Sequence, residues 1–304
     1  MRIGVAATPN VAIPTLNWLL QSEHELALVI TRPDKAAGRG RLVMESPVAQ
    51  WAKAHEVECV KPVASQDLFE RLANMDLIVT IGYGVILPVE ILSIPRFGFI
   101  NLHFSHLPAW RGAAPVQRAI LNGESKFGVS VFALDQGMDT GPMYVQRDLF
   151  IEPYETAGEL LTRMASMGPE VVADSIAMIE SGVTPVDQSD MGVSYAPKIS
   201  KEEARISWGN SAVQVDRLIR AFTPEPGAWT TWRGVSLRID RARIFPINRE
   251  VPAGWLIRDS GGVLVSCGES SALILEEVTP SGKKLMSAKS WANGARIIEG
   301  ESFV

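Results

Sequence analysis

Short apolar runs alternate with amphipathic stretches along the first 190 residues of the chain. The apolar runs have the length of buried strands and fall at 2–8, 25–31, 57–62, 76–83, 98–103 and 128–134. Apolar side chains recur at helical spacing in the intervening stretches 13–21, 46–55, 65–74 and 116–123, and later in 157–182. This alternation predicts an α/β domain in which helices cover both faces of a parallel sheet.

The rest of the chain has a different pattern. Residues 183–206 are polar and contain prolines, which is typical of a linker. One helix, 211–222, is then followed by short strands at 228–234, 235–245, 253–258, 262–268 and 271–280, and such strands between turns indicate a small β-barrel. We therefore predict an α/β domain over residues 1–190, a linker over 191–206 and a barrel domain over 207–304.

Polar side chains gather where two of the predicted strands end. Asn101 and His103 lie two residues apart at the end of strand 98–103, so they point to one face. Asp139 lies in a glycine-punctuated loop just after strand 128–134. A strand-helix-strand unit would bring both strand ends to one edge of a parallel sheet, where such proteins bind ligands. The three side chains are expected to converge in one cleft.

Each of these residue types has a use in acyl transfer to an amine. An Asn amide can donate to a developing oxyanion, and a His titrates near neutrality. An Asp beside the His orients the ring and raises its pKa. On residue types alone, a structural explanation is about as good: Asn101 and Asp139 as caps of turns and His103 as a satisfied strand-end side chain.

Composition limits the class of protein. The chain is 46% hydrophobic and 21% charged, as in ordinary globular proteins. Cys59 and Cys267 are far apart, and neither belongs to a metal-binding motif. There is no secretion signal, and no apolar run approaches the ~18 residues that would span a membrane. We expect a reduced, cytoplasmic, monomeric protein with no membrane partner.

Charge is distributed unevenly. Residues 1–204 carry 16 Lys and Arg against 24 acids, whereas the remainder carries 13 against 10. Arg32, Lys35, Arg39 and Arg41 fall in one glycine-rich stretch that could contact phosphates, although a solvated basic loop explains it equally well.

Aromatic and basic residues of the C-terminal half allow two interpretations. Trp208, Trp229, Trp232, Trp255 and Trp291 might stack on bases, but apolar neighbours favour a place in the barrel core. The pair of Lys283 and Lys284 might bind phosphate or lie in an ordinary surface turn.

Ordered motifs over nearly the whole chain resemble one known family. The pattern Asn-x-His-x-Ser-x-Leu-Pro begins at Asn101, Arg-Gly follows at Arg111, and Asp-x-Gly-x-Asp-x-Gly begins at Asp135. Together these resemble the folate-dependent formyltransferases, and the wording RGAAPVQ is similar to the branch acting on methionyl-tRNA. RIGVAATPN, TRPDKAAGRG, IGYGVILP, YAPKISKEEARISW and SGKKLMSAKSWANGARI extend the resemblance. Three residues depart from it: Ala7 for the usual Gly, His106 for Leu and Ala109 for a basic residue.

The resemblance implies a Rossmann-like formyltransferase domain followed by an OB-like barrel that binds tRNA. It implies that Asn101, His103 and Asp139 are catalytic and that no metal is required. The formyl group of 10-formyltetrahydrofolate would pass to the α-amino group of methionyl-initiator tRNA. Binding of the folate is implied for two segments: Ser105, His106, Leu107 and Pro108, and Val85, Ile86 and Leu87. Contact with tRNA is implied for Arg32, Lys35, Arg39, Arg41, Lys283 and Lys284.

Two other functions stay open at this level. A formyltransferase acting on another amine, such as a nucleotide-linked amino sugar, would use the same three residues but would leave the barrel and the basic loop without a role. A non-catalytic folate- or RNA-binding protein would not need that combination of residues.

Overall fold

The computed structural model describes residues 1–37, 42–247, 251–259, 262–298 and 300–304. They form two compact units. Unit 1 comprises residues 1–115, 126–150 and 161–197, and unit 2 comprises residues 116–125, 151–160 and 198–304. The predicted boundaries at residues 190 and 206 stay a prediction, because the chain passes back and forth between the two units.

A seven-stranded sheet organises unit 1, with the order β10-β9-β7-β6-β1-β2-β5. The strands are β1 (Arg2–Ala7), β2 (Glu25–Ile30), β5 (Cys59–Val60), β6 (Leu77–Ile81), β7 (Phe99–His103), β9 (Lys126–Ala133) and β10 (Met143–Phe150). The pairs from β7 through β6, β1 and β2 to β5 are all parallel. Every residue of β6 is buried, as expected of a central strand covered on both faces.

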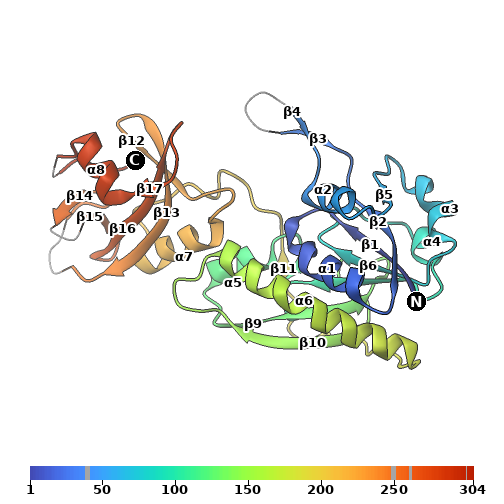
Figure 1. Cartoon of the computed structure of the whole chain (residues 1–304). Coiled ribbons are helices and arrows are strands. Elements are labelled where there is room, and N and C mark those ends of the chain that lie inside the picture. The colour runs from blue at the N-terminus through green and yellow to red at the C-terminus, as the bar shows by residue number, and fades with distance from the viewer. Residues whose placement is uncertain (38–41, 248–250, 260–261, 299) are drawn as a thin grey trace. The chain divides into compact units, whose positions relative to one another are not determined.

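Helices flank this sheet (Figure 1). They are α1 (Ile13–Gln21), α2 (Pro47–Ala54), α3 (Phe69–Leu72), α4 (Val89–Leu92) and most of α6 (Ala157–Glu180). Local sequence explains where α2 begins: the Ser46 hydroxyl accepts from the Ala49 amide and Pro47 occupies the first turn. The predicted Rossmann-like α/β architecture is confirmed.

One expectation about this sheet is wrong. β9 runs antiparallel to β7, with Asn101 opposite Phe132 and His103 opposite Ser130. The connection from Phe104 to Ser125 does not carry the chain back across the sheet. The Leu107 amide donates to the Ser130 hydroxyl, so the chain after β7 stays close to β9, and its helix α5 (Pro115–Asn122) belongs mainly to unit 2. β9 therefore starts near the end of β7 and runs back along it.

Residues 183–197 are part of unit 1 and pair with other segments there. Val186 forms an antiparallel bridge with Met143. The short strand β11 (Tyr195–Ala196) pairs in parallel with β8 (Arg111–Gly112). Part of the stretch predicted as a linker thus lies alongside the segment that follows β7. A second small pairing, β3 (Lys35–Ala37) with β4 (Leu42–Met44), makes a hairpin that extends from β2 in Figure 1.

An antiparallel sheet forms the body of unit 2. Its order is β12-β13-β16-β15-β14, and β17 also pairs with β16. The strands are β12 (Trp229–Trp232), β13 (Val235–Phe245), β14 (Leu256–Asp259), β15 (Gly262–Cys267), β16 (Ser271–Pro280) and β17 (Met286–Ser287). Helices α7 (Ala212–Phe222) and α8 (Ala288–Ala295) contribute apolar side chains to the core, and Ser211 caps α7 with a capping box. This antiparallel half-barrel confirms the predicted barrel-like second domain.

The last residues of the chain connect the two edge strands of the half-barrel. Val304 exchanges two backbone hydrogen bonds with Thr231 of β12, at 2.9 and 3.0 Å. On the other side, the Leu256 amide of β14 donates to Glu301 O at 2.7 Å. Phe303 is 4% exposed and stacks with Trp208 and Trp291, whose ring centroids are 5.3 and 6.0 Å away.

The core location of the tryptophans is confirmed for two of the five. Trp208 and Trp291 are buried in the core of unit 2, and Trp229 and Trp232 pack against it. Trp255 is partly buried beside Gly300.

Candidate active site

A pocket of about 480 Å³ opens at the carboxyl ends of β6 and β7, within unit 1. Asn101, His103 and Asp139 all line it. The walls come from the loop after β6, the segment after β8 and the loop after β9; these contribute Gly82 to Leu87, Gly112, Ala113, Pro115, and Leu134 to Asp139. The predicted convergence of the amide, the imidazole and the carboxylate is what the structure contains.

Asn101 is held by its neighbour on β6. The Thr80 hydroxyl lies 2.9 Å from both Asn101 Oδ1 and Ile100 O. With one proton, this hydroxyl donates to one oxygen at a time. Because the amide oxygen faces Thr80, the amide NH₂ group is the part of Asn101 left to face the pocket.

The ring of His103 is buried, with 7% of the residue exposed. Its Nε2 lies 3.3 Å from Trp110 O, and the edge of Phe132 packs against the ring. A carbonyl oxygen only accepts, so Nε2 carries the proton in the neutral ring. Nδ1, the nitrogen that then has a lone pair, lies 3.9 Å from Asp139 Oδ2, which is too long for a hydrogen bond.

The loop after β9 brings Asp139 to the site. The sequence had predicted that the end of a parallel strand would do so. β9 ends at Ala133, opposite Ile100, and the next six residues bring Asp139 forward to His103. Asp139 has a φ of +55°, a left-handed conformation that Asp tolerates better than most residues. Its Oδ2 accepts from the Gly112 amide at 2.7 Å, which fixes the carboxylate.

Burial lowers the pKa of His103, and this outweighs the opposite effects of the Asp139 carboxylate and of Trp110 O. Asp139 does raise the pKa of His103, as expected, but burial has the larger effect in the free protein. In this environment the neutral imidazole prevails at neutral pH, with its Nδ1 lone pair turned toward the carboxylate.

Apolar residues and loop backbone also line the pocket. Val85, Ile86 and Leu87 lie in a loop outside any helix or strand. Ile86 is 83% exposed, and Met138, which also lines the pocket, is 57% exposed. Flat apolar surface beside peptide groups that have no strand partner suits a planar heterocycle with its own donors and acceptors.

Comparison with known proteins places this geometry in a family. The model of the formyl transferase family matches residues 1–176, and that of its C-terminal domain matches residues 198–296. The chain belongs to the formyl transferase family.

Individual relatives agree with this membership. A methionyl-tRNA formyltransferase of Thermobifida fusca is 45% identical over 308 residues, covering 100% of this chain and 99% of the relative. One of Streptomyces coelicolor is 44% identical, covering 99% of each. Among solved structures, an N-formyltransferase of Helicobacter canadensis has a TM-score of 0.68 at 19% identity, covering 90% and 98% of the two chains. A methionyl-tRNA formyltransferase of Clostridium thermocellum has a TM-score of 0.59 at 18% identity, covering 90% and 99%.

The two segments predicted for folate in this formyl transferase lie in different places. Val85, Ile86 and Leu87 line the pocket, whereas Ser105, His106, Leu107 and Pro108 do not. Ser105 is buried and its hydroxyl donates to Ala109 O. Leu107 is buried, and Gln146 Nε2 donates to its carbonyl oxygen. The ring of His106 is half-exposed, and its Nε2 lies 3.1 Å from Asp148 Oδ1.

Four of the six residues predicted to contact tRNA lie within the described part of the chain. Lys35 is exposed at the start of β3, and Arg32 lies just before it with Nη1 near Gly84. Arg39 and Arg41 lie outside the described residues. Lys283 and Lys284 are exposed in the turn between β16 and β17 of unit 2.

Sequence reasoning missed several residues that build the site: Thr80, Gly112 and Gln188. Gly112 was within a quoted motif but had no assigned role. Thr80 had only its place two residues before a glycine-marked loop as a signal. Gln188 lay in the polar, proline-containing stretch 183–206, and nothing in the sequence connects it to Asp139.

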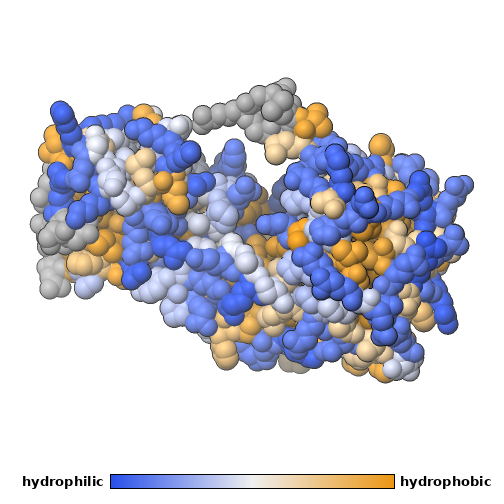
Figure 2. Space-filling view, viewed as in Figure 1, coloured by the Kyte–Doolittle hydropathy of each residue, from blue (hydrophilic) through white to orange (hydrophobic). Residues whose placement is uncertain are grey.

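In the part of the chain that the structure describes, no helix combines the length and hydropathy needed to cross a membrane. Figure 2 shows a mostly hydrophilic face, with apolar surface gathered over the part of unit 1 where Figure 1 labels β2 and β6.

Proposed function

We propose that this formyl transferase moves the formyl group of 10-formyltetrahydrofolate to the α-amino group of methionine esterified to initiator tRNA. One observation carries the proposal: Asn101, His103 and Asp139 meet in one pocket of a chain that is 45% identical, end to end, to a methionyl-tRNA formyltransferase. The product is N-formylmethionyl-tRNA for translation initiation.

The pocket suits the formyl donor. Its volume of about 480 Å³ falls within the range of small-molecule sites. The backbone of Val85 to Leu87 can read the donors and acceptors of a pterin ring, and Ile86 and Met138 can cover its faces. Bound there, the folate would supply a formyl group already activated for transfer.

The neutral state of His103 suggests how the protons move. Asn101 donates from its amide to the formyl oxygen as negative charge develops there. His103 Nδ1 accepts the proton of the attacking amine while the new N–C bond forms. The imidazolium is then stabilised by Asp139 and by Trp110 O, and it returns the proton to the folate nitrogen as the old C–N bond breaks. Protons and electron pairs balance without a further reactant.

Basic residues of both units would bind the tRNA that carries the acceptor amine. Arg32, Lys35, Arg39 and Arg41 would contact tRNA phosphates, and so would Lys283 and Lys284 of unit 2. A domain division near residues 190–206, action as a monomer and a cytoplasmic location, where charged tRNA occurs, are further parts of the proposal.

Acceptor competition tests the proposal. Purified protein is incubated with 10-formyltetrahydrofolate and one of three acceptors: methionyl-initiator tRNA, free methionine or a nucleotide-linked amino sugar. Transfer of labelled formyl should require the charged tRNA. Preferred formylation of the amino sugar, or of none of the three, would refute it.

A further inference from the structure

Residues 183–197, which follow α6 in unit 1, contact the backbone of the active site. The Ser194 hydroxyl accepts from the Trp110 amide at 2.9 Å, and β11 pairs with Arg111 and Gly112. These neighbours matter because Trp110 O contacts the His103 ring and the Gly112 amide binds the Asp139 carboxylate. The segment thus fixes the backbone groups that touch two of the three reacting side chains.

Gln188 on this segment contacts the Asp139 loop directly. Its Nε2 donates to Asp139 O at 2.9 Å and to Gly141 O at 2.8 Å. Gly141 allows little movement, since a Cβ there would meet Ala133 O. Two hydrogen bonds from one amide therefore hold both ends of the turn that presents the Asp139 carboxylate.

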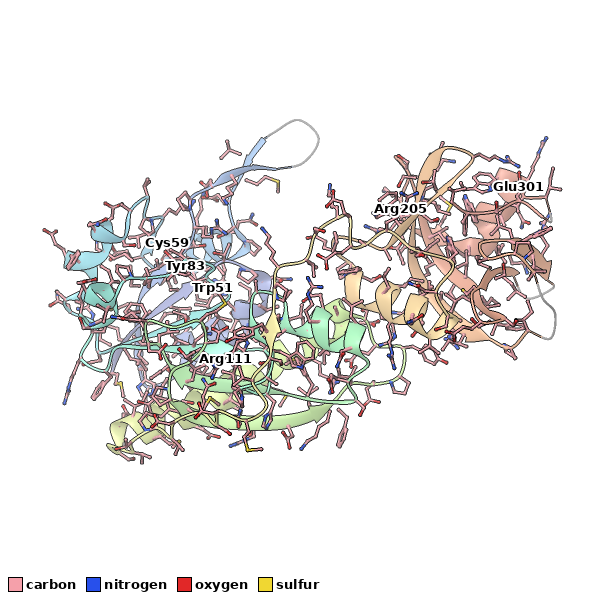
Figure 3. All side chains as sticks on the ribbon, turned by 180° about the vertical axis from the view of Figure 1, so that it is seen from behind. Trp51, Cys59, Tyr83, Arg111, Arg205 and Glu301 are labelled. Atoms are coloured by element: carbon pink, nitrogen blue, oxygen red, sulfur yellow. The ribbon has the colours of Figure 1, made fainter. Side chains whose placement is uncertain are left out.

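Arg111 determines which way the Gln188 amide faces. Its Nη2 donates to Gln188 Oε1 at 2.7 Å, and the residue is only 9% exposed. A guanidinium has donors only, so it selects the oxygen of the amide and leaves the nitrogen for the two carbonyl groups. Arg111 is labelled in Figure 3, within unit 1.

We propose that Gln188, oriented by Arg111, is a positioning residue that holds the Asp139 carboxylate beside His103. Asp139 has a left-handed φ of +55°, so its loop needs contacts that maintain this conformation. Without the Gln188 bonds, the carboxylate moves away from Nδ1 and stabilises the imidazolium less. This inference rests on the proposed function, since it concerns the same reaction.

Titration of His103 gives a readout that does not depend on turnover. The titratable groups on the walls around its ring are Asp139, Asp135 and Tyr83, and Trp110 O faces Nε2. Of these, Asp139 raises the pKa of His103 against burial. A carboxylate that moves away would let this pKa fall further.

The experiment compares the full-length protein with Gln188→Met and Gln188→Glu. Met has a similar length but removes all three bonds, whereas Glu retains the acceptor for Arg111 and removes both donors. Asp187→Asn is the matched control, because Asp187 is an exposed neighbour on the same segment. The protein has four histidines, so ring-proton NMR can follow each one, with His103→Gln giving the assignment.

Gln188→Met should lower the pKa of His103 measured by NMR, whereas Asp187→Asn should leave it at the wild-type value. Both Gln188 variants should lower kcat at least ~10-fold, the usual scale for the partners of a functional group, with KM for the folate donor within about threefold. Unchanged His103 titration in Gln188→Met would overturn the inference, even if kcat fell through general loss of folded protein.

The controls separate this inference from the proposed function. If the wild-type protein does not formylate methionyl-tRNA, the proposed function fails, while the NMR titration still tests the position of Asp139. If the wild-type protein is active and Gln188→Met retains its kcat, only the role of Gln188 is refuted.

Discussion

Two opposing effects act on the pKa of the His103 imidazole. Burial lowers its pKa, and the Asp139 carboxylate, 3.9 Å away, raises it. Burial is the stronger, so the resting ring is neutral and can accept a proton. Once the ring is protonated, the same carboxylate stabilises the cation. His103 can therefore act first as a base and afterwards as an acid without a change in its surroundings.

Removing any of the three reacting side chains should reduce turnover strongly. Asn101→Ala, His103→Ala and Asp139→Ala are each expected to lower kcat at least ~100-fold, the scale for losing an oxyanion donor or an acid–base group. Formyl transfer to methionyl-tRNA gives the rates, and circular dichroism checks the fold. Near-normal turnover of His103→Ala would show that the proton takes another route.

The lowered pKa of His103 also predicts a pH dependence of stability. Between the folded-state pKa and the usual value of 6.5, the unfolded chain binds more protons at this site than the folded chain. The free energy of unfolding should therefore rise with pH through this window and decline as pH falls below 6.5. Urea unfolding of wild type and His103→Gln at several pH values isolates the effect as their difference; two parallel curves would contradict it.

At the scale of elements, the sequence predicts the strands of unit 1 well but not all their directions. Runs such as 76–83 are mostly apolar because both faces of β6 are covered. The direction of β9 depends on whether residues 104–125 cross the sheet, and they do not. An amphipathic pattern such as that of α5 predicts which face of the helix is buried. It does not predict which other element that face packs against.

The active site shows the same division. Asn101 and His103 are predictable because they share one strand and its period of two. Asp139 was predicted to be near them for the wrong reason, since a returning loop brings it there. The pKa of His103 and the contact of Gln188 arise from packing between distant segments, which no local pattern contains.

The β3–β4 hairpin allows a test of tRNA binding. Its base is held by Lys61, which forms ion pairs with Asp34 and Glu45 at 2.8 and 3.0 Å. If its tip contacts phosphates, Arg39→Ala with Arg41→Ala should weaken tRNA binding and flatten the log–log salt dependence by about one unit per lost contact. Affinity for 10-formyltetrahydrofolate should not change.

Binding isotherms at several salt concentrations measure this slope. Lys53→Ala, which removes an exposed charge from α2, is the matched control and should behave as wild type. A slope in the double variant equal to that of wild type would leave the hairpin without phosphate contacts.

At the scale of the whole molecule, closure of the half-barrel depends on the C-terminal segment. Phe303→Ala removes a buried ring stacked with Trp208 and Trp291 and should lower the free energy of unfolding by about 3–5 kcal/mol. Ile298→Ala, at a side chain that is 66% exposed, should have little effect. Urea unfolding monitored by tryptophan fluorescence compares the two variants. Equal stabilities would mean that the segment does not stabilise unit 2.

The two units are interleaved along the chain, and this affects how unit 2 can fold during synthesis on the ribosome. Residues 116–125 and 151–160 are made early, yet they pack with residues made after 198. Gly123 lies against Arg217, and the Gly158 amide donates to Thr223 O. At about 5–20 residues per second, these early segments wait several seconds for α7. Apolar side chains such as that of Leu121, which packs against the core of unit 2, are then exposed to chaperones and to other nascent chains.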